Sequence, residues 1–146
     1  MVEIETFLRG VGGGFVQVEA CRTSPPDLDY IEGAIRISVD GIEIIGTGEW
    51  DYVDQLWCYI AEMVRGVQSS GYAETYFPDQ PIMLSFEAIG SRILVTSEIG
   101  GEIKRANASK LDLLEAVKSA GMIFFRKMSD LAPANSYSEA QQELSV

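Results

Sequence analysis

The feature that most constrains the fold is residues 51–66, DYVDQLWCYIAEMVRG, whose apolar side chains repeat at the spacing of a helix with one buried side. The residues of this apolar stripe are Val53, Leu56, Trp57, Ile60, Met63 and Val64. Asp51 is predicted to cap the start of the helix, and Arg65 with Gly66 is predicted to end it. A helix with so wide an apolar stripe is unstable alone in water, so we expect it to pack on a sheet.

The runs of sequence before this helix alternate between apolar and polar residues, as strands do. Residues 2–9 and 15–22 are joined by a glycine-rich link and are predicted to form a hairpin. Residues 30–39 and 42–45 stand on either side of Asp-Gly at 40–41. This dipeptide suits a type I′ turn, because both central positions of that turn need a positive φ. The first half of the chain is therefore predicted to be a four-stranded antiparallel meander.

The chain after the helix begins with a polar stretch, residues 67–81, which is predicted to be a long connection without regular structure. Residues 82–89 and 92–98 alternate on either side of a Gly-Ser turn and are predicted to form a second hairpin. Residues 102–106 are predicted to add a short edge strand. The second half of the chain thus adds two or three strands to the sheet.

A second helix is predicted to begin at Ser109, which stands three residues before Asp112 as in a capping box. Residues 133–146 are polar, lack a sustained period and are predicted to be a disordered or loosely attached tail. Residues 1–132 are predicted to form a single α+β domain with the element order β-β-β-β-α-β-β-(β)-α. We expect one antiparallel sheet of six to seven strands with two helices on one face, either open and twisted or curled into a partial barrel.

The charge of the chain narrows the classes of partner. It has 22 acidic and 11 basic residues, and its formal net charge is −11. Proteins bind nucleic acid and anionic membranes through Lys and Arg, so we expect neither as a partner. A basic protein partner fits this charge, because complementary charge speeds association. The alternative is that the surplus acid only keeps a small protein in solution.

The sequence also predicts a cytoplasmic protein without a cofactor. No apolar stretch approaches the roughly 18 residues of a membrane span, and acidic residues stand where a signal peptide has basic ones. Cys21 and Cys58 are predicted to be reduced, mostly buried thiols, and the alternative is a redox pair or a metal-binding pair. The chain has no histidine, which removes the usual general base at neutral pH and the commonest zinc ligand. We therefore favour a non-catalytic protein.

Carboxylate chemistry is the remaining route to an enzyme, or to a protein that binds a metal or a small molecule. Glu49, Asp51 and Asp54 crowd the predicted start of the first helix and are the candidates for binding Mg²⁺ or Ca²⁺. The competing explanation is that these acids cap the helix and compensate its dipole. We favour this second explanation, and so predict no metal site.

Acidic residues stand beside aromatic residues in two of the predicted connections, and such residues are good contact residues at protein interfaces. The predicted partner-binding residues are Asp27, Asp29, Tyr30, Trp50, Tyr72, Tyr76, Phe77 and Asp79. The alternatives are solvated turns for the acids, and aromatic rings that fold back over the helix end or pack at the sheet edge. A further interpretation is that Met122 and Ile123 widen the apolar surface of the second helix into the seam of a homodimer.

Three runs of the sequence, GEWDYVDQLWCYIAEMV, FPDQPIMLSFEAIGSRILVTSE and LLEAVKSAGMIFFRKM, resemble the layout of small acidic immunity proteins from bacterial polymorphic-toxin systems. Those proteins place a Trp-containing helix before a hairpin and finish with a helix bearing paired aromatics. The resemblance covers about residues 48–131, is one of pattern, and carries over no functional residue. It implies a protein that binds and blocks a toxin, such as a basic nuclease.

Overall fold

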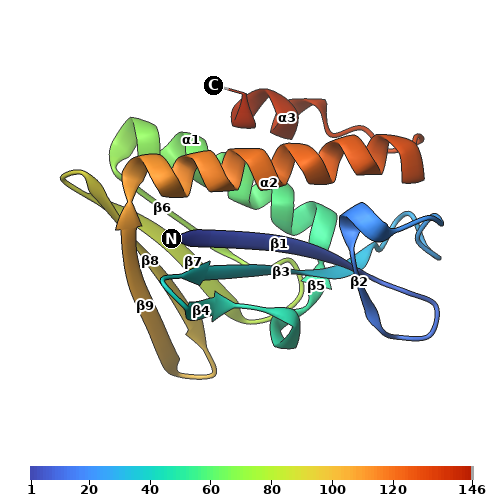
Figure 1. The fold of residues 1–146 in the computed structure, drawn as a ribbon, viewed down its shortest axis with the longest axis horizontal. Coiled ribbons are helices and arrows are strands. Elements are labelled where there is room, and N and C mark those ends of the chain that lie inside the picture. The colour runs from blue at the N-terminus through green and yellow to red at the C-terminus, as the bar shows by residue number, and fades with distance from the viewer. Residues whose placement is uncertain (146) are drawn as a thin grey trace.

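The computed structural model describes residues 1–145, and within them the chain forms two antiparallel sheets and three α-helices (Figure 1). The predicted α+β class with antiparallel strands is confirmed. The strands number nine and divide into sheets of five and four, where the sequence predicted six or seven in one sheet. The additional strands are short or lie at an edge, where alternation between apolar and polar residues is weakest.

The first sheet contains β1 (Val2–Arg9), β2 (Phe15–Gln17), β3 (Glu32–Val39), β4 (Ile42–Ile45) and β5 (Asp51–Tyr52). Its strand order is β2-β1-β3-β4, and β5 also pairs with β3. The predicted meander is therefore wrong in order, because β3 pairs with β1 along seven residue pairs and does not contact β2 as a neighbour.

The chain leaves β2 earlier than predicted and does not continue into a neighbouring strand. A 3₁₀ turn at Val18–Ala20 follows β2 directly and buries Val18 in the core, so the predicted strand 15–22 ends at Gln17. The next strand then returns along the free edge of β1. The Asp-Gly turn between β3 and β4 is confirmed, with φ values of 50° at Asp40 and 83° at Gly41.

The second sheet is a meander of β6 (Tyr72–Tyr76), β7 (Ile82–Ile89), β8 (Arg92–Ile99) and β9 (Glu102–Ser109). The last three strands confirm the predicted hairpin and edge strand, and β9 is longer than predicted. The predicted connection over residues 67–81 is wrong, because β6 lies inside it. Only one side of β6 faces the interior, and small or polar side chains occupy it, so its sequence carries no clear apolar alternation.

Helix α1 (Val53–Ser70) begins two residues after its predicted start and ends four residues after its predicted end. Gly66 lies inside the helix, where a Cβ would stand 3.2 Å from the Cβ of Ala73 on β6. This glycine therefore serves close packing of helix on strand, and Gly71, with a φ of 82°, ends the helix. A 3₁₀ turn at Thr47–Glu49 precedes β5 and the helix.

Helix α2 (Lys110–Leu131) starts as predicted, because the Ser109 side chain accepts a hydrogen bond from the backbone N–H of Asp112 at 3.4 Å. Beyond it, the expectation of a disordered tail is corrected over α3 (Ser138–Leu144). This helix packs on α1 and buries Ala140 and Leu144. Two apolar residues in one short helix give no period that sequence analysis detects.

The core is built around Trp57 of α1, whose ring is fully buried. Its indole N–H donates to the hydroxyl of Thr6 on β1 at 3.1 Å, and its ring stacks on Phe124 of α2 at 6.3 Å between centroids. The two sheets are tied by the Ser97 hydroxyl, which donates to the Ile44 carbonyl at 2.7 Å. All three helices lie along one side of the strands (Figure 1). In the described part of the chain, no helix has the length and apolar character needed to cross a membrane.

Candidate functional site

Several segments distant in sequence meet at one end of the molecule, beside the N-terminus of α1. They bring together aromatic rings and carboxylates, and we call this group the acidic–aromatic surface. Its residues are Arg9, Asp27, Asp29, Tyr30, Glu32, Trp50, Tyr52 and Asp79. This surface includes five residues that the sequence predicted for partner contact. Arg9 and Tyr52 were not predicted, and Glu32, although it belongs to the acidic cluster around Tyr30 in the sequence, is not among the predicted contact residues.

A cavity of about 580 Å³ opens on this surface. Its walls come from the glycine-rich β1–β2 loop, the Pro25-Pro26-Asp27 segment, the end of β1 and the start of β3. The rings of Tyr30 and Tyr52 line it with centroids 5.3 Å apart and planes inclined by 53°. Tyr30 is 57% exposed, so its ring is available to a partner.

Strand pairing and a local turn hold these residues in place. Glu32 pairs with Tyr52 where β3 meets β5, which sets Tyr52 beside the start of β3. The Asp27 side chain accepts a hydrogen bond from the Asp29 backbone N–H at 3.0 Å, which fixes the turn before Tyr30. The pairing of β5 depends on tertiary structure, so Tyr52 looked like a helix residue in the sequence.

Asp51 anchors the loop that carries Asp79. Its carboxylate is 2% exposed and accepts backbone hydrogen bonds from Tyr52 at 2.7 Å, Asp79 at 3.1 Å and Gln80 at 2.9 Å. The Gln80 side chain in turn donates to the Trp50 carbonyl. The helix cap predicted for Asp51 is therefore wrong: Asp51 lies before the helix, and its carboxylate organises the loop between β6 and β7.

Trp50 is half-buried, and the guanidinium of Arg9 lies 4.5 Å from its ring centroid. Arg9 also stands 3.8 Å from the carboxylate of Glu32 and 6.0 Å from the ring of Phe15. Arg9 therefore covers one face of the indole ring. The two interpretations of Trp50 were an exposed anchor and a ring packed at the sheet edge. The observed geometry lies between these two.

The electrostatics of the surface favour a positively charged ligand. Partial burial, and then the negative charges of Asp79 and Glu32, raise the pKa of Tyr52 above its ordinary value. Its hydroxyl therefore stays protonated at neutral pH and remains a hydrogen-bond donor. The aromatic faces and carboxylate oxygens together suit an ammonium or guanidinium group.

The remaining predicted contact residues lie elsewhere. Tyr72 and Tyr76 project from β6 on the face of the second sheet that is turned away from the helices. Phe77 is 5% exposed and belongs to the core, so its predicted contact role is corrected. Its backbone N–H bonds to the Ile82 carbonyl, and the ring turns inward, which was the alternative interpretation of the loop aromatics.

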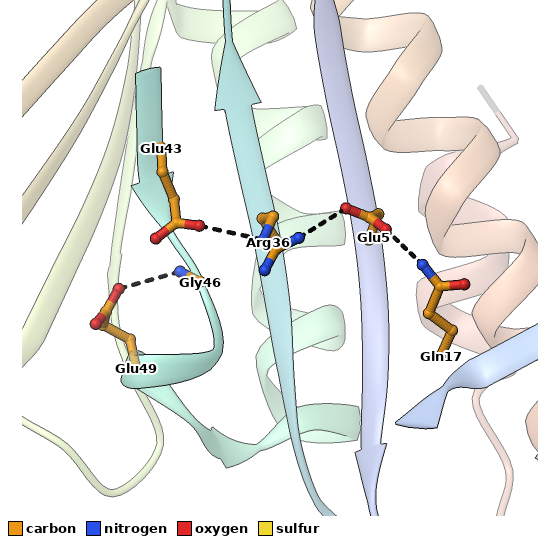
Figure 2. Close-up of polar contacts among 6 residues, drawn as sticks. All are labelled: Glu5, Gln17, Arg36, Glu43, Gly46 and Glu49. Carbon is orange, nitrogen blue, oxygen red and sulfur yellow. Dashed lines mark hydrogen bonds and ion pairs between the residues drawn. The ribbon is translucent and has the colours of Figure 1, made fainter. Parts of the chain in front are cut away.

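The three candidate metal ligands do not converge on one point. The Glu49 carboxylate accepts from the Gly46 backbone N–H at 3.0 Å (Figure 2), and Asp51 holds the loop described above. Asp54 accepts from the Tyr137 hydroxyl at 2.8 Å, and burial raises its pKa. Over residues 1–145, no group of three or more His, Cys, Asp or Glu side chains is placed to hold a metal ion. Each of these three carboxylates therefore has a structural role.

The outer face of the first sheet is also open, but its charges pair with one another. Arg36 lies between Glu5 and Glu43, with nitrogen–oxygen distances of 3.1 Å to each, and Gln17 donates to Glu5 (Figure 2). The Arg36 guanidinium also lies 5.4 Å from the ring centroid of Phe7. On the acidic–aromatic surface Arg9 pairs with Glu32, but within residues 1–145 the carboxylates of Asp27, Asp29 and Asp79 form no ion pair. The first-sheet face, whose Arg36 is shared by Glu5 and Glu43, is therefore the weaker candidate for binding a cation.

Comparisons with family models, with curated proteins and with solved structures found no match. The fold and the site define an α+β domain that presents an acidic, aromatic-lined cavity. The function is therefore argued from the chemistry of this surface.

Proposed function

We propose that this protein is a non-catalytic binding module that captures a basic protein partner on its acidic–aromatic surface. The observation that carries the proposal is the cavity lined by Tyr30, Tyr52 and the carboxylate of Asp27, beside Glu32, which pairs with Arg9 of the same cavity. A lysine or arginine side chain of the partner enters this cavity, where its charge meets carboxylates and its length packs on the rings.

The energies of such contacts fit a docking surface. A cation over an exposed aromatic ring contributes about 0.5–1 kcal/mol, and more when the pair is removed from water. The net charge of −11 adds a long-range attraction, which raises the rate of encounter with a basic partner and weakens as salt is added.

The resemblance to immunity proteins supports a more specific form of this proposal. In it, the partner is a basic toxin, such as a nuclease, and the bound module blocks the toxin by covering its positively charged surface. We place this activity in the cytoplasm. Cys21 and Cys58 are both free thiols, and each is half-buried.

A capture experiment tests the proposal. The tagged protein is incubated with host lysate at about 50 mM and about 500 mM salt, and bound proteins are identified by mass spectrometry. The wild type is compared with Asp27→Asn/Tyr30→Ala, which alters the cavity, and with Glu3→Gln, an exposed acid on the first sheet.

We expect one basic protein to be retained at low salt by the wild type and by the Glu3→Gln control. The cavity variant and the high-salt wash should both release it. Retention of the same protein by the cavity variant contradicts the proposal, and so does the absence of any basic partner.

A further inference from the structure

The four strands of the second sheet have one face that no helix covers. The buried side chains of Leu84, Phe86 and Val95 identify the side of this sheet that faces the core, and α1, α2 and β4 contact the sheet. The opposite side carries several exposed apolar and aromatic residues, and we call it the open face. The most exposed of them are Tyr72, Tyr76, Ile89 and Ile103, with exposed fractions of 43%, 63%, 58% and 50%.

Strand register arranges the open face in rows that cross the sheet from β6 to β9. The first row is Tyr76, Met83, Glu98 and Ile103. The second row is Glu74, Ser85, Thr96 and Arg105. The third row is Tyr72, Glu87, Leu94 and Asn107. Each row therefore has one end on β6 and the other on β9.

The charges of the second row stand at its two ends. Glu74 and Arg105 are separated by three strand spacings, which is about 14 Å at roughly 4.8 Å per spacing. They are too far apart to pair within one chain, and among residues 1–145 Arg105 forms no ion pair. The Glu74 carboxylate accepts a hydrogen bond from the Tyr72 hydroxyl at 2.9 Å.

We propose that the open face is the interface of a homodimer in which two copies pack sheet against sheet about a two-fold axis parallel to the strands. This axis lies between β7 and β8, so β6 of one copy faces β9 of the other. Each row therefore faces the same row of the second copy, which runs in the opposite direction. Glu74 then faces Arg105 of the second copy, and Tyr76 faces its Ile103. Each of these contacts occurs twice.

Charge also selects this orientation over the other in-plane two-fold axis. An axis perpendicular to the strands stacks β6 on β6, which sets Glu74 against Glu74 and Arg105 against Arg105. Like charges in contact across an interface cost several kcal/mol. The parallel axis avoids both clashes and turns the same four groups into two opposite-charge pairs.

The overall charge of the face permits two acidic chains to approach. Its acids are Glu74, Glu87 and Glu98, and its bases are Arg92 and Arg105, so this face is close to neutral on a chain with a net charge of −11. Four strands of up to eight residues present about 500 Å² per copy, from strand spacing and rise. Two copies together bury about 1,000 Å², which reaches the lower limit for a specific interface.

This interface is separate from the acidic–aromatic surface and from the surface of α2 around Met122 and Ile123. Dimerisation covers Tyr72 and Tyr76 and leaves Tyr30 and Trp50 free. The dimer therefore presents two copies of the acidic–aromatic surface, and its failure in a test leaves the proposed binding function unaffected.

Sedimentation equilibrium on the full chain tests the dimer. We expect the wild type to sediment at twice the chain mass of 16.0 kDa. Glu74→Arg and Arg105→Glu each create two like-charge contacts per dimer, so each variant alone should raise the dimer dissociation constant at least 100-fold. Glu3→Arg and Arg126→Glu make the same charge changes away from the open face and should leave the mass unchanged.

The decisive arm is an equimolar mixture of Glu74→Arg with Arg105→Glu. In Glu74→Arg both ends of the second row are positively charged, and in Arg105→Glu both are negatively charged. A dimer of one variant with the other therefore restores two opposite-charge contacts, so we expect the mixture to form dimers. Recovery also shows that both variants are folded. A monomeric wild type overturns the proposal, as does a mixture that stays monomeric or a wild-type dimer that both reversals leave intact.

Discussion

Asp51→Ala is predicted to destabilise the protein by about 3 kcal/mol, because one buried carboxylate holds the loop between β6 and β7. The carboxylate accepts the backbone N–H groups of Asp79 and Gln80, and these are the bonds that tie the loop to the start of α1. A hydrogen bond to a charged acceptor contributes about 1.5–3 kcal/mol. Two such bonds give about 3–6 kcal/mol, and the lower end applies because Asp79 is exposed and water replaces part of its lost bond.

Urea unfolding at 25 °C, followed by tryptophan fluorescence, measures this loss. With a denaturant slope of about 1.5 kcal/mol per molar, a loss of about 3 kcal/mol lowers the urea midpoint by about 2 M. Asp29→Ala is the matched control, since Asp29 is exposed, and its expected effect is within about 0.5 kcal/mol. Asp51→Asn keeps the shape of the side chain but loses its charge, so its loss should lie between these two.

Equal and small shifts of the urea midpoint in Asp51→Ala and Asp29→Ala would contradict this prediction. That result would mean that the loop holds its conformation without the carboxylate. It would also remove the explanation for how Asp79 comes to lie beside Tyr52.

Three further predictions concern packing, pH and metal ions. Gly121→Ala is predicted to destabilise the protein by about 1 kcal/mol despite better helix propensity, because the new Cβ would lie 2.6 Å from Cδ1 of the buried Leu144 and 3.0 Å from the buried Trp57 ring. A higher melting temperature contradicts this prediction. Burial, and then the charges of Glu62 and Glu139, raise the pKa of Glu143, so the stability linked to its protonated form is present at acid pH and is lost as pH rises through the folded-state pKa. Glu143→Gln should therefore raise the melting temperature at about pH 7 and leave it unchanged at about pH 4, whereas an equal effect at both pH values counts against the charge cluster. Mg²⁺ and Ca²⁺ at about 5 mM are predicted to leave the melting temperature unchanged; a rise of several degrees would revive the metal-binding alternative.

Periodicity in the sequence was sufficient for the elements that bury a regular stripe or face. The apolar spacing around Trp57 predicted α1, and alternation predicted β1, β3, β7 and β8 close to their observed bounds. The turn at Asp40-Gly41 and the start of α2 at Ser109 were predicted from local backbone chemistry alone, which does not depend on the rest of the fold.

Elements defined by tertiary contacts were missed. Strand β6 has one half-buried side made of small or polar residues, and α3 buries only two apolar residues, so neither has a detectable period. Val18 is buried in a 3₁₀ turn directly after β2, and β3 pairs with β1; these tertiary contacts leave no period in the sequence.

The sequence predicted only part of the candidate site, because some of its residues come together through tertiary contacts. Acids beside aromatics were visible in the sequence, and they identified Asp27, Tyr30 and Asp79. Arg9 and Tyr52 join them only through the fold, one at the end of a strand and the other in a two-residue strand. Phe77 shows the opposite error, since an aromatic in a polar segment turned into the core.

Hydrogen–deuterium exchange on the captured complex tests the binding account most directly. We predict slower exchange in the bound state for backbone amides of residues 27–32, 50–52 and 79–80, which carry the acidic–aromatic surface, and unchanged exchange on the outer face of β3 and β4. Protection confined to β3 and β4, or to any surface that excludes Tyr30 and Tyr52, would contradict the account.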